Sequence, residues 1–124
     1  AVQSTVDGLV SSGNLLTTCP VIVAEYCFSA RNSAELDELQ ADMGLLYLLE
    51  SDDLTPRVKH IQSALWSTGL SRAAGSSDTL TAAYGLEHNQ TIVTCDVDFV
   101  HIAQALEKTW TQPPLRVIHI MEPP

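Results

Sequence analysis

Three acidic residues stand in short, otherwise apolar or small-residue segments, where a carboxylate is most readily explained by chemistry. They are Glu25 in PVIVAEYCFSAR, Asp78 in GSSDTLTAAYG and Asp96 in TIVTCDVDFVHIA. Residues 91–94 form a largely β-branched run, which predicts a strand that ends beside Asp96. Open α/β sheets bind ligands beyond the carboxyl ends of their strands. Carboxylates that meet there from distant parts of the chain are suited to hold a hard divalent cation.

Two further residues near these acids have open assignments. Asp98 either joins the metal ligands or caps a helix that begins at Phe99. Arg72, in the loop before Asp78, either contacts a substrate phosphate or pairs with an acid. Asp78 lies near a predicted helix start, so its charge could instead simply complement the helix dipole. Glu25 lies beside an apolar helical stripe, where an unpaired buried carboxylate would be costly, so we expect it to be functional.

Helices and short β-prone runs alternate along the chain. The pattern predicts strands at residues 15–18, 48–50, 91–95 and 115–120. Helix signals separate them: Pro20 at a first helical position, an Asn32–Glu35 capping box, a stop at Gly69, and a cap at Ser76 or Ser77. Residues 100–108 form the last predicted helix. We therefore expect one α/β domain over residues 1–124, with a mainly parallel sheet and helices on both faces.

Composition limits the classes of function. The chain has 124 residues and a formal net charge of −9, which argues against a simple nucleic-acid binder and favours a basic partner. This charge does not exclude an enzyme that acts on nucleic acid through a bound metal ion. The three cysteines are widely spaced in apolar settings and are expected to be free thiols in a reducing cytoplasm. No apolar run approaches the roughly 18 residues that a membrane span needs.

The acidic segments resemble those of the PIN-domain nucleases, and most closely the VapC-type toxins of bacterial toxin–antitoxin pairs. The resemblance runs from about residue 15 to the C-terminus. Its firmest segments are CPVIVAEYCFSAR, GSSDTLTAAYGLEHNQTIVTCDVDFVHIA and RVIHIMEP. It implies a three-layer α/β/α domain that hydrolyses phosphodiester bonds of cellular RNA with Mg²⁺ or Mn²⁺. Glu25, Asp78 and Asp96 would be catalytic, and they would bind metal together with Asp98.

The same resemblance implies the partners. Such toxins are held inactive by a cognate antitoxin, whose C-terminal segment often places a basic side chain among the carboxylates. A homodimer in the cytoplasm, with no membrane association, is expected on the same ground. The family also opens with a strand that ends in an aspartate, whereas this sequence starts inside the helix or loop that follows. We therefore expect a preceding segment of on the order of 15 residues that supplies a central strand and one more metal-binding aspartate.

Two other functions remain open at this point. A catalytically inactive PIN-like module that serves only as an interaction scaffold would follow if the chain truly began at Ala1. A phosphatase or phosphoryl-transfer domain could also use clustered aspartates. Its nucleophile loop would need small or hydroxyl residues after the second acid, where this chain has Phe99.

Overall fold

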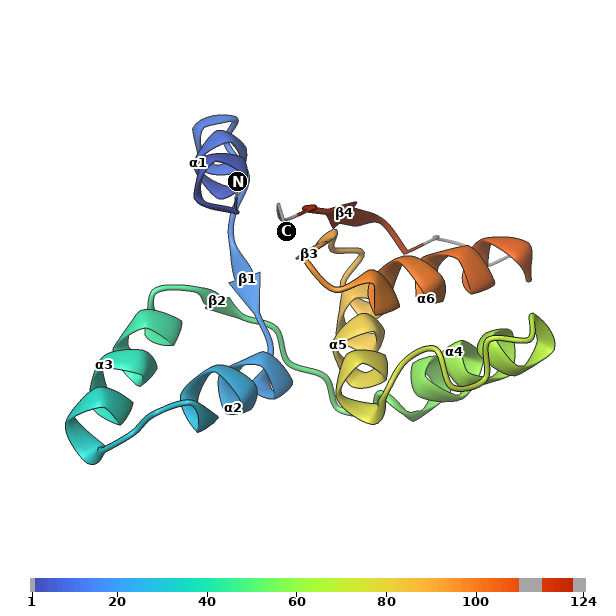
Figure 1. The fold of residues 1–124 in the computed structure, drawn as a ribbon, viewed down its shortest axis with the longest axis horizontal. Helices are drawn as coiled ribbons and strands as arrows, with labels where there is room; N and C mark the ends of the chain where they lie inside the picture. Colours follow the sequence, from blue (N-terminus) through green and yellow to red (C-terminus); the bar gives the residue numbers. More distant parts are fainter. Residues whose placement is uncertain (1, 110–114, 122–124) are drawn as a thin grey trace.

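A computed structural model describes residues 2–109 and 115–121 (Figure 1). One or two helices separate successive short strands along these residues, which confirms the prediction of a mixed α/β chain. The elements are α1 (Val2–Ser11), β1 (Thr17–Thr18), α2 (Pro20–Phe28), α3 (Ser33–Gly44), β2 (Tyr47–Leu48), α4 (Thr55–Ser67), α5 (Ser76–Glu87), β3 (Ile92–Thr94), α6 (Val97–Lys108) and β4 (Val117–His119).

The four strands form two separate parallel pairs, whereas the sequence predicts one sheet. β1 pairs with β2, with Thr17 opposite Tyr47, and β3 pairs with β4, with Val93 opposite Ile118. Figure 1 shows the β1–β2 pair beside α2 and α3, and the β3–β4 pair beside α5 and α6. The parallel direction is confirmed within each pair. Among the residues that the structure describes, no strand joins β1 to β3.

The hydrophobic core is built by the second half of the chain. Its fully buried members Ile61 and Leu65 come from α4, and Ile102 and Leu106 come from α6. Ala82 and Ala83 of α5 are also fully buried, because small side chains let this helix approach its neighbours closely. This packed unit fixes the amino ends of α5 and α6, from which Asp78 and Asp96 project.

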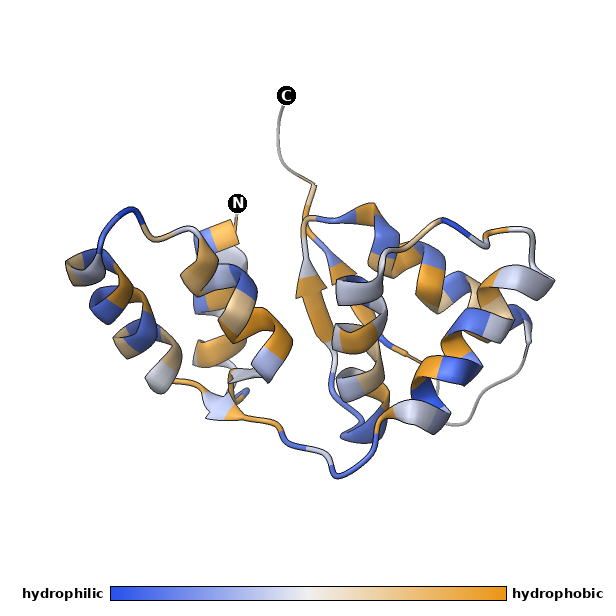
Figure 2. Ribbon diagram, turned by 90° about the horizontal axis from the view of Figure 1, so that it is seen from below, coloured by the Kyte–Doolittle hydropathy of each residue, from blue (hydrophilic) through white to orange (hydrophobic). Residues whose placement is uncertain are grey.

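Helices α1, α2 and α3 contribute no buried residue. Their side of the molecule keeps large apolar side chains in solvent, including Leu15 at 73% exposure and Leu45 at 85%. Figure 2 shows these helices on one side and the packed α4–α6 unit on the other. The two sides are joined by the segment that links β2 to α4.

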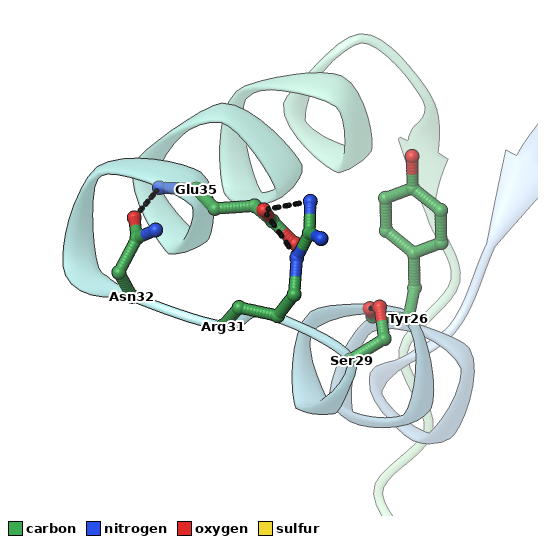
Figure 3. A network of polar contacts seen from close by, with 5 residues as sticks. All are labelled: Tyr26, Ser29, Arg31, Asn32 and Glu35. Atoms are coloured by element: carbon green, nitrogen blue, oxygen red, sulfur yellow. Dashed lines mark hydrogen bonds and ion pairs between the residues drawn. The ribbon is translucent and has the colours of Figure 1, made fainter.

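The α2–α3 corner is held by local polar contacts (Figure 3). Asn32 Oδ1 accepts the Glu35 backbone N–H at 2.8 Å, as the capping-box motif predicts. The Glu35 carboxylate pairs with Arg31 at 3.1 Å, so only the first half of the capping box is found. Ser29 Oγ donates to the Tyr26 carbonyl at 2.8 Å at the end of α2.

One predicted helix cap is wrong, and the open assignment of Asp98 as a cap is excluded. Helix α5 begins at Ser76 after Gly75, and no side chain caps it, so neither Ser76 nor Ser77 has the predicted role. Helix α6 begins at Val97, and its cap is Asp96 rather than Asp98. The predicted stop after α4 is confirmed, since Gly69 takes a φ of +77° that favours glycine. Within the described residues, no helix is long and apolar enough to cross a membrane.

Candidate metal centre

Asp96 is held in place at the junction between β3 and α6. Its backbone N–H donates to Thr94 Oγ1 at 2.9 Å, and its Oδ1 accepts the Asp98 backbone N–H at 2.9 Å. This second bond is a helix N-cap, in which a side-chain oxygen satisfies a free N–H of the first turn. One carboxylate oxygen of Asp96 is therefore used to begin α6, and the other is left for a ligand. Sequence reasoning missed the part played by Thr94, although a hydroxyl two residues before an aspartate is a recognisable turn signal.

The structure brings Asp78 and Asp98 to the same place. Asp78 lies in the first turn of α5 and Asp98 in the first turn of α6. Carboxylate oxygens of Asp78, Asp96 and Asp98 all lie within 4.8 Å of one another. Three of the four predicted metal ligands thus converge, Asp98 included. The positive ends of two helix dipoles meet there and reduce the mutual repulsion of these carboxylates.

The negative charges of this acidic cluster, defined as Asp78, Asp96 and Asp98, act on the pKa of one of its members. The pKa of Asp78 is raised from 3.8 to about 6, first by partial burial and then by the negative charges of Asp96, Asp98 and Glu25. A side-chain hydrogen bond with Asp98 acts in the same direction. A cation bound nearby would lower the pKa of this carboxyl and offset the repulsion from its negative neighbours.

Glu25 approaches the acidic cluster from α2 without joining it. Its charge acts on Asp78, and its side chain lines the same cavity, but it is not among the carboxylates within 4.8 Å. Glu25 is exposed, so the expectation of a buried carboxylate was wrong. The apolar residues of α2 are exposed or only half-buried, and none is buried.

Arg72 lies in the turn that joins α4 to α5. It is exposed and lies outside the wall of the cavity next to the acidic cluster. Contact with a substrate phosphate therefore stays a prediction for this residue.

A cavity of about 980 Å³ separates the two halves of the molecule and opens next to the acidic cluster. Its walls include β1 and β3, together with Glu25, Asp78 and Asp96. The composition of its walls was not predicted, since it depends on how the two strand pairs are placed. The cavity brings solvent and extended ligands within reach of the carboxylates.

The donor set of the acidic cluster fits a hard divalent cation. Mg²⁺ and Mn²⁺ prefer carboxylate oxygens, and Mg²⁺ is commonly held by one or two carboxylates with water and substrate oxygens completing its shell. Asp78, Asp96 and Asp98 supply at least that number. Comparison with protein families gives no matching family for this chain, and comparison with curated proteins gives no match.

Proposed function

We propose that this chain is a metal-dependent endoribonuclease with a PIN-like three-layer α/β/α fold. The observation that carries the proposal is the convergence of Asp78, Asp96 and Asp98 within 4.8 Å at the start of two helices. Asp96 and Asp98 follow the carboxyl end of β3, which pairs in parallel with β4. In open α/β sheets, ligands bind beyond the carboxyl ends of the strands. The order and flanks of the acidic segments support the nuclease class through their resemblance to VapC-type toxins.

The three aspartates would hold Mg²⁺ or Mn²⁺, and Asp96 would be the most rigid ligand. Its position is fixed by the bonds from its own N–H to Thr94 and from the Asp98 N–H to its carboxylate. Asp78 would need to be ionised, which the ion itself favours. A bound divalent ion supplies a lowered pKa for the attacking water and neutralisation of charge on the phosphoryl oxygens.

In this proposal Glu25 acts on the attacking water and is not a ligand of the metal ion. It stands apart from the acidic cluster on α2 and faces the same cavity. Phosphodiester hydrolysis forms a bond from a water oxygen to phosphorus, releases a proton and breaks the bond from phosphorus to the leaving oxygen. A carboxylate at the position of Glu25 can orient that water and accept its proton.

RNA as substrate, and an antitoxin as inhibitor, rest on the resemblance together with charge. At a net charge of −9, a polyanion would be attracted through the bound ion and isolated cations such as Arg72, not through a basic surface. The same carboxylates would attract a basic side chain of an antitoxin. A homodimer and a cytoplasmic location belong to the same proposal.

The deciding experiment is cleavage of cellular RNA by the protein freed of any partner. Activity should require Mg²⁺ or Mn²⁺, disappear with EDTA, and fall at least a hundredfold in Asp96→Asn. The matched control is Asp37→Asn, which removes an equal charge from an exposed position on α3 and should leave cleavage unchanged. Equal cleavage by wild type and folded Asp96→Asn would refute the site.

A catalytically inactive interaction scaffold is the second candidate. It is favoured by the division of the strands into two pairs and by helices α1–α3 that bury no residue. Metal binding separates the two functions. A scaffold predicts that Mn²⁺ leaves the unfolding transition of the wild type unchanged, whereas the nuclease predicts a shift that is lost in Asp96→Asn.

A further inference from the structure

We propose that Trp66 and Arg72 form a platform for an unpaired base and its phosphate in the RNA substrate. Trp66 lies at the end of α4, and Arg72 lies in the connection that leads to α5. Neither residue belongs to the acidic cluster or lines the cavity beside it. This assignment rests on the proposed function, since it names how the same site selects its RNA: the strand must be single-stranded on one side of the cut.

The ring of Trp66 is presented to solvent by a helix whose other face is buried. Trp66 is 70% exposed in the last turn of α4, whereas Ile61 and Leu65 of the same helix are packed in the core. A large, mostly apolar ring in water gains free energy when a flat partner covers it. Unpaired bases stack on such rings, and every base has a face that can do so.

The segment around Trp66 is the cationic part of an acidic protein. Residues 54–77 contain no aspartate or glutamate and three of the six basic side chains, Arg57, Lys59 and Arg72. The first two lie near the carboxylates of Glu87 and Asp53. Arg72 is exposed and belongs to no ion pair among the described residues. At a net charge of −9, most of the surface repels a polyanion, so Arg72 is the cation that a phosphate beside Trp66 would meet.

The packing of α4 against α5 places the platform on the same side of the protein as the acidic cluster. Arg57, near the start of α4, pairs at 3.8 Å with Glu87, the last residue of α5. The opposite ends of these two helices therefore lie on one side of the packed unit. The end of α4 carries Trp66, and the start of α5 carries Asp78. Figure 1 shows the connection that runs back from the end of α4 to the start of α5.

This connection is anchored, so the position of Arg72 is fixed. Leu70, Ala73 and Ala74 pack against the hydrophobic core. The Ala73 N–H also donates to the Leu70 carbonyl at 2.9 Å, which closes a turn around Arg72. The side chain of Arg72 is exposed on this turn. An RNA strand that follows the connection passes from Trp66 over Arg72 to the acidic cluster.

The first test measures binding without cleavage, by fluorescence anisotropy of a labelled oligoadenylate in EDTA at low salt. Trp66→Leu keeps an apolar side chain but removes the aromatic face, so it should weaken binding about fivefold or more. Trp66→Phe keeps an aromatic face and should retain most of the affinity. The matched control is Phe28→Leu, which removes a 90% exposed ring at the end of α2 and should leave binding unchanged. Annealing the strand to oligouridylate should weaken its binding to the wild type, because no unpaired base remains.

Two further readouts separate stacking from charge. In Trp110→Phe, Trp66 is the only tryptophan, and its emission should fall as oligoadenylate is added but not as the duplex is added. Arg72→Gln should weaken binding and reduce the slope of log affinity against log salt by about 0.7, the value for one phosphate contact in a single strand. Arg31→Gln, at the exposed α2–α3 corner, should leave that slope unchanged.

Cleavage with Mn²⁺ distinguishes this inference from the nuclease itself. Trp66→Leu should raise KM about fivefold or more and leave kcat nearly unchanged, because the platform binds substrate away from the reacting atoms. If the wild type cuts RNA and folded Trp66→Leu binds and cuts it equally well, the platform is wrong and the nuclease stands. If nothing is cut but Trp66→Leu still loses binding, the nuclease is wrong and the RNA platform stands. Emission of Trp66 that changes with protein concentration alone would assign this surface to a second copy and overturn the proposal.

Discussion

The carboxylate of Asp96 accepts the backbone N–H of Asp98 at 2.9 Å, while the carboxylates of both residues belong to the acidic cluster. One side chain therefore begins helix α6 and also presents negative charge to the cavity. The two roles use different properties of Asp96. The cap needs an acceptor oxygen, and a metal needs charge.

Asparagine and alanine at position 96 should separate these roles. Asparagine is as good an N-cap as aspartate, so Asp96→Asn should leave the free energy of unfolding in EDTA within about 0.5 kcal/mol of wild type. Asp96→Ala should lose about 1 kcal/mol. Both variants should bind Mn²⁺ at least tenfold more weakly by calorimetry. If Asp96→Asn bound Mn²⁺ as tightly as the control Asp37→Asn, Asp96 would not be a ligand.

Removing the charge of Asp78 should stabilise the protein in the absence of metal. Its pKa is about 6 when folded against an ordinary 3.8. Between these values the unfolded chain releases a proton that the native state keeps, so the free energy of unfolding falls as pH rises and stays lowered above pH 6. Asp78→Asn should match wild type below pH 4 and exceed it by about 1 kcal/mol at pH 7, after allowance for solvent screening.

Urea unfolding in EDTA at pH 3.5, 5 and 7 measures this difference. Asp37→Asn, which removes an equal charge from an exposed position, is the matched control. A loss of stability in Asp78→Asn of the same size at pH 3.5 and pH 7 would show that packing, not charge, dominates at this position.

Protons and metal should compete at Asp78. Below pH 6 its carboxyl is largely protonated, so the apparent affinity for Mg²⁺ or Mn²⁺ should fall by up to about tenfold per pH unit between pH 6 and pH 5. Above pH 7 the affinity should level off. Calorimetric titrations at pH 5, 6, 7 and 8 test this. Asp78→Asn should show a weaker pH dependence, and an affinity that is flat from pH 5 to 7 in wild type would contradict the prediction.

Glu25→Gln should affect cleavage more than metal binding. Glu25 lies outside the 4.8 Å acidic cluster, yet its charge raises the pKa of Asp78. We expect less than a threefold change in Mn²⁺ affinity and at least a tenfold loss of cleavage, if Glu25 orients the water. A variant that loses Mn²⁺ binding as severely as Asp96→Asn would make Glu25 a ligand instead.

The acidic cluster could be predicted because its signals are local. Asp96 follows a β-branched run and Asp78 stands at a helix start, so each position is set by a few neighbouring residues. The sequence leaves the role of Asp98 open for the same reason, because a helix that begins at Val97 is capped by Asp96, and one that begins at Phe99 is capped by Asp98. The structure places the start at Val97, which makes Asp96 the cap and turns Asp98 toward Asp78.

The division of the sheet could not be predicted in detail. Strand pairing joins residues far apart in the chain, such as Thr17 with Tyr47, and it depends on tertiary packing rather than on local preference. Residues 15–18 have the composition of a strand, but only Thr17–Thr18 form β1. Leu15 lies before β1 and remains exposed.

The two halves of the molecule should respond differently to the same loss of side-chain volume. Leu65 of α4 is buried in the core, whereas Leu45, just after α3, is 85% exposed. Leu65→Ala should lower the free energy of unfolding by about 2–5 kcal/mol, because it leaves a cavity among packed neighbours. Leu45→Ala should change it by less than about 0.5 kcal/mol. Urea unfolding followed by circular dichroism makes the comparison. Equal losses would mean that Leu45 is covered in solution, by a partner or a second copy. Because the variants are matched in chemistry, their difference would measure how much of the stability resides in the α4–α6 unit that holds the acidic cluster in place.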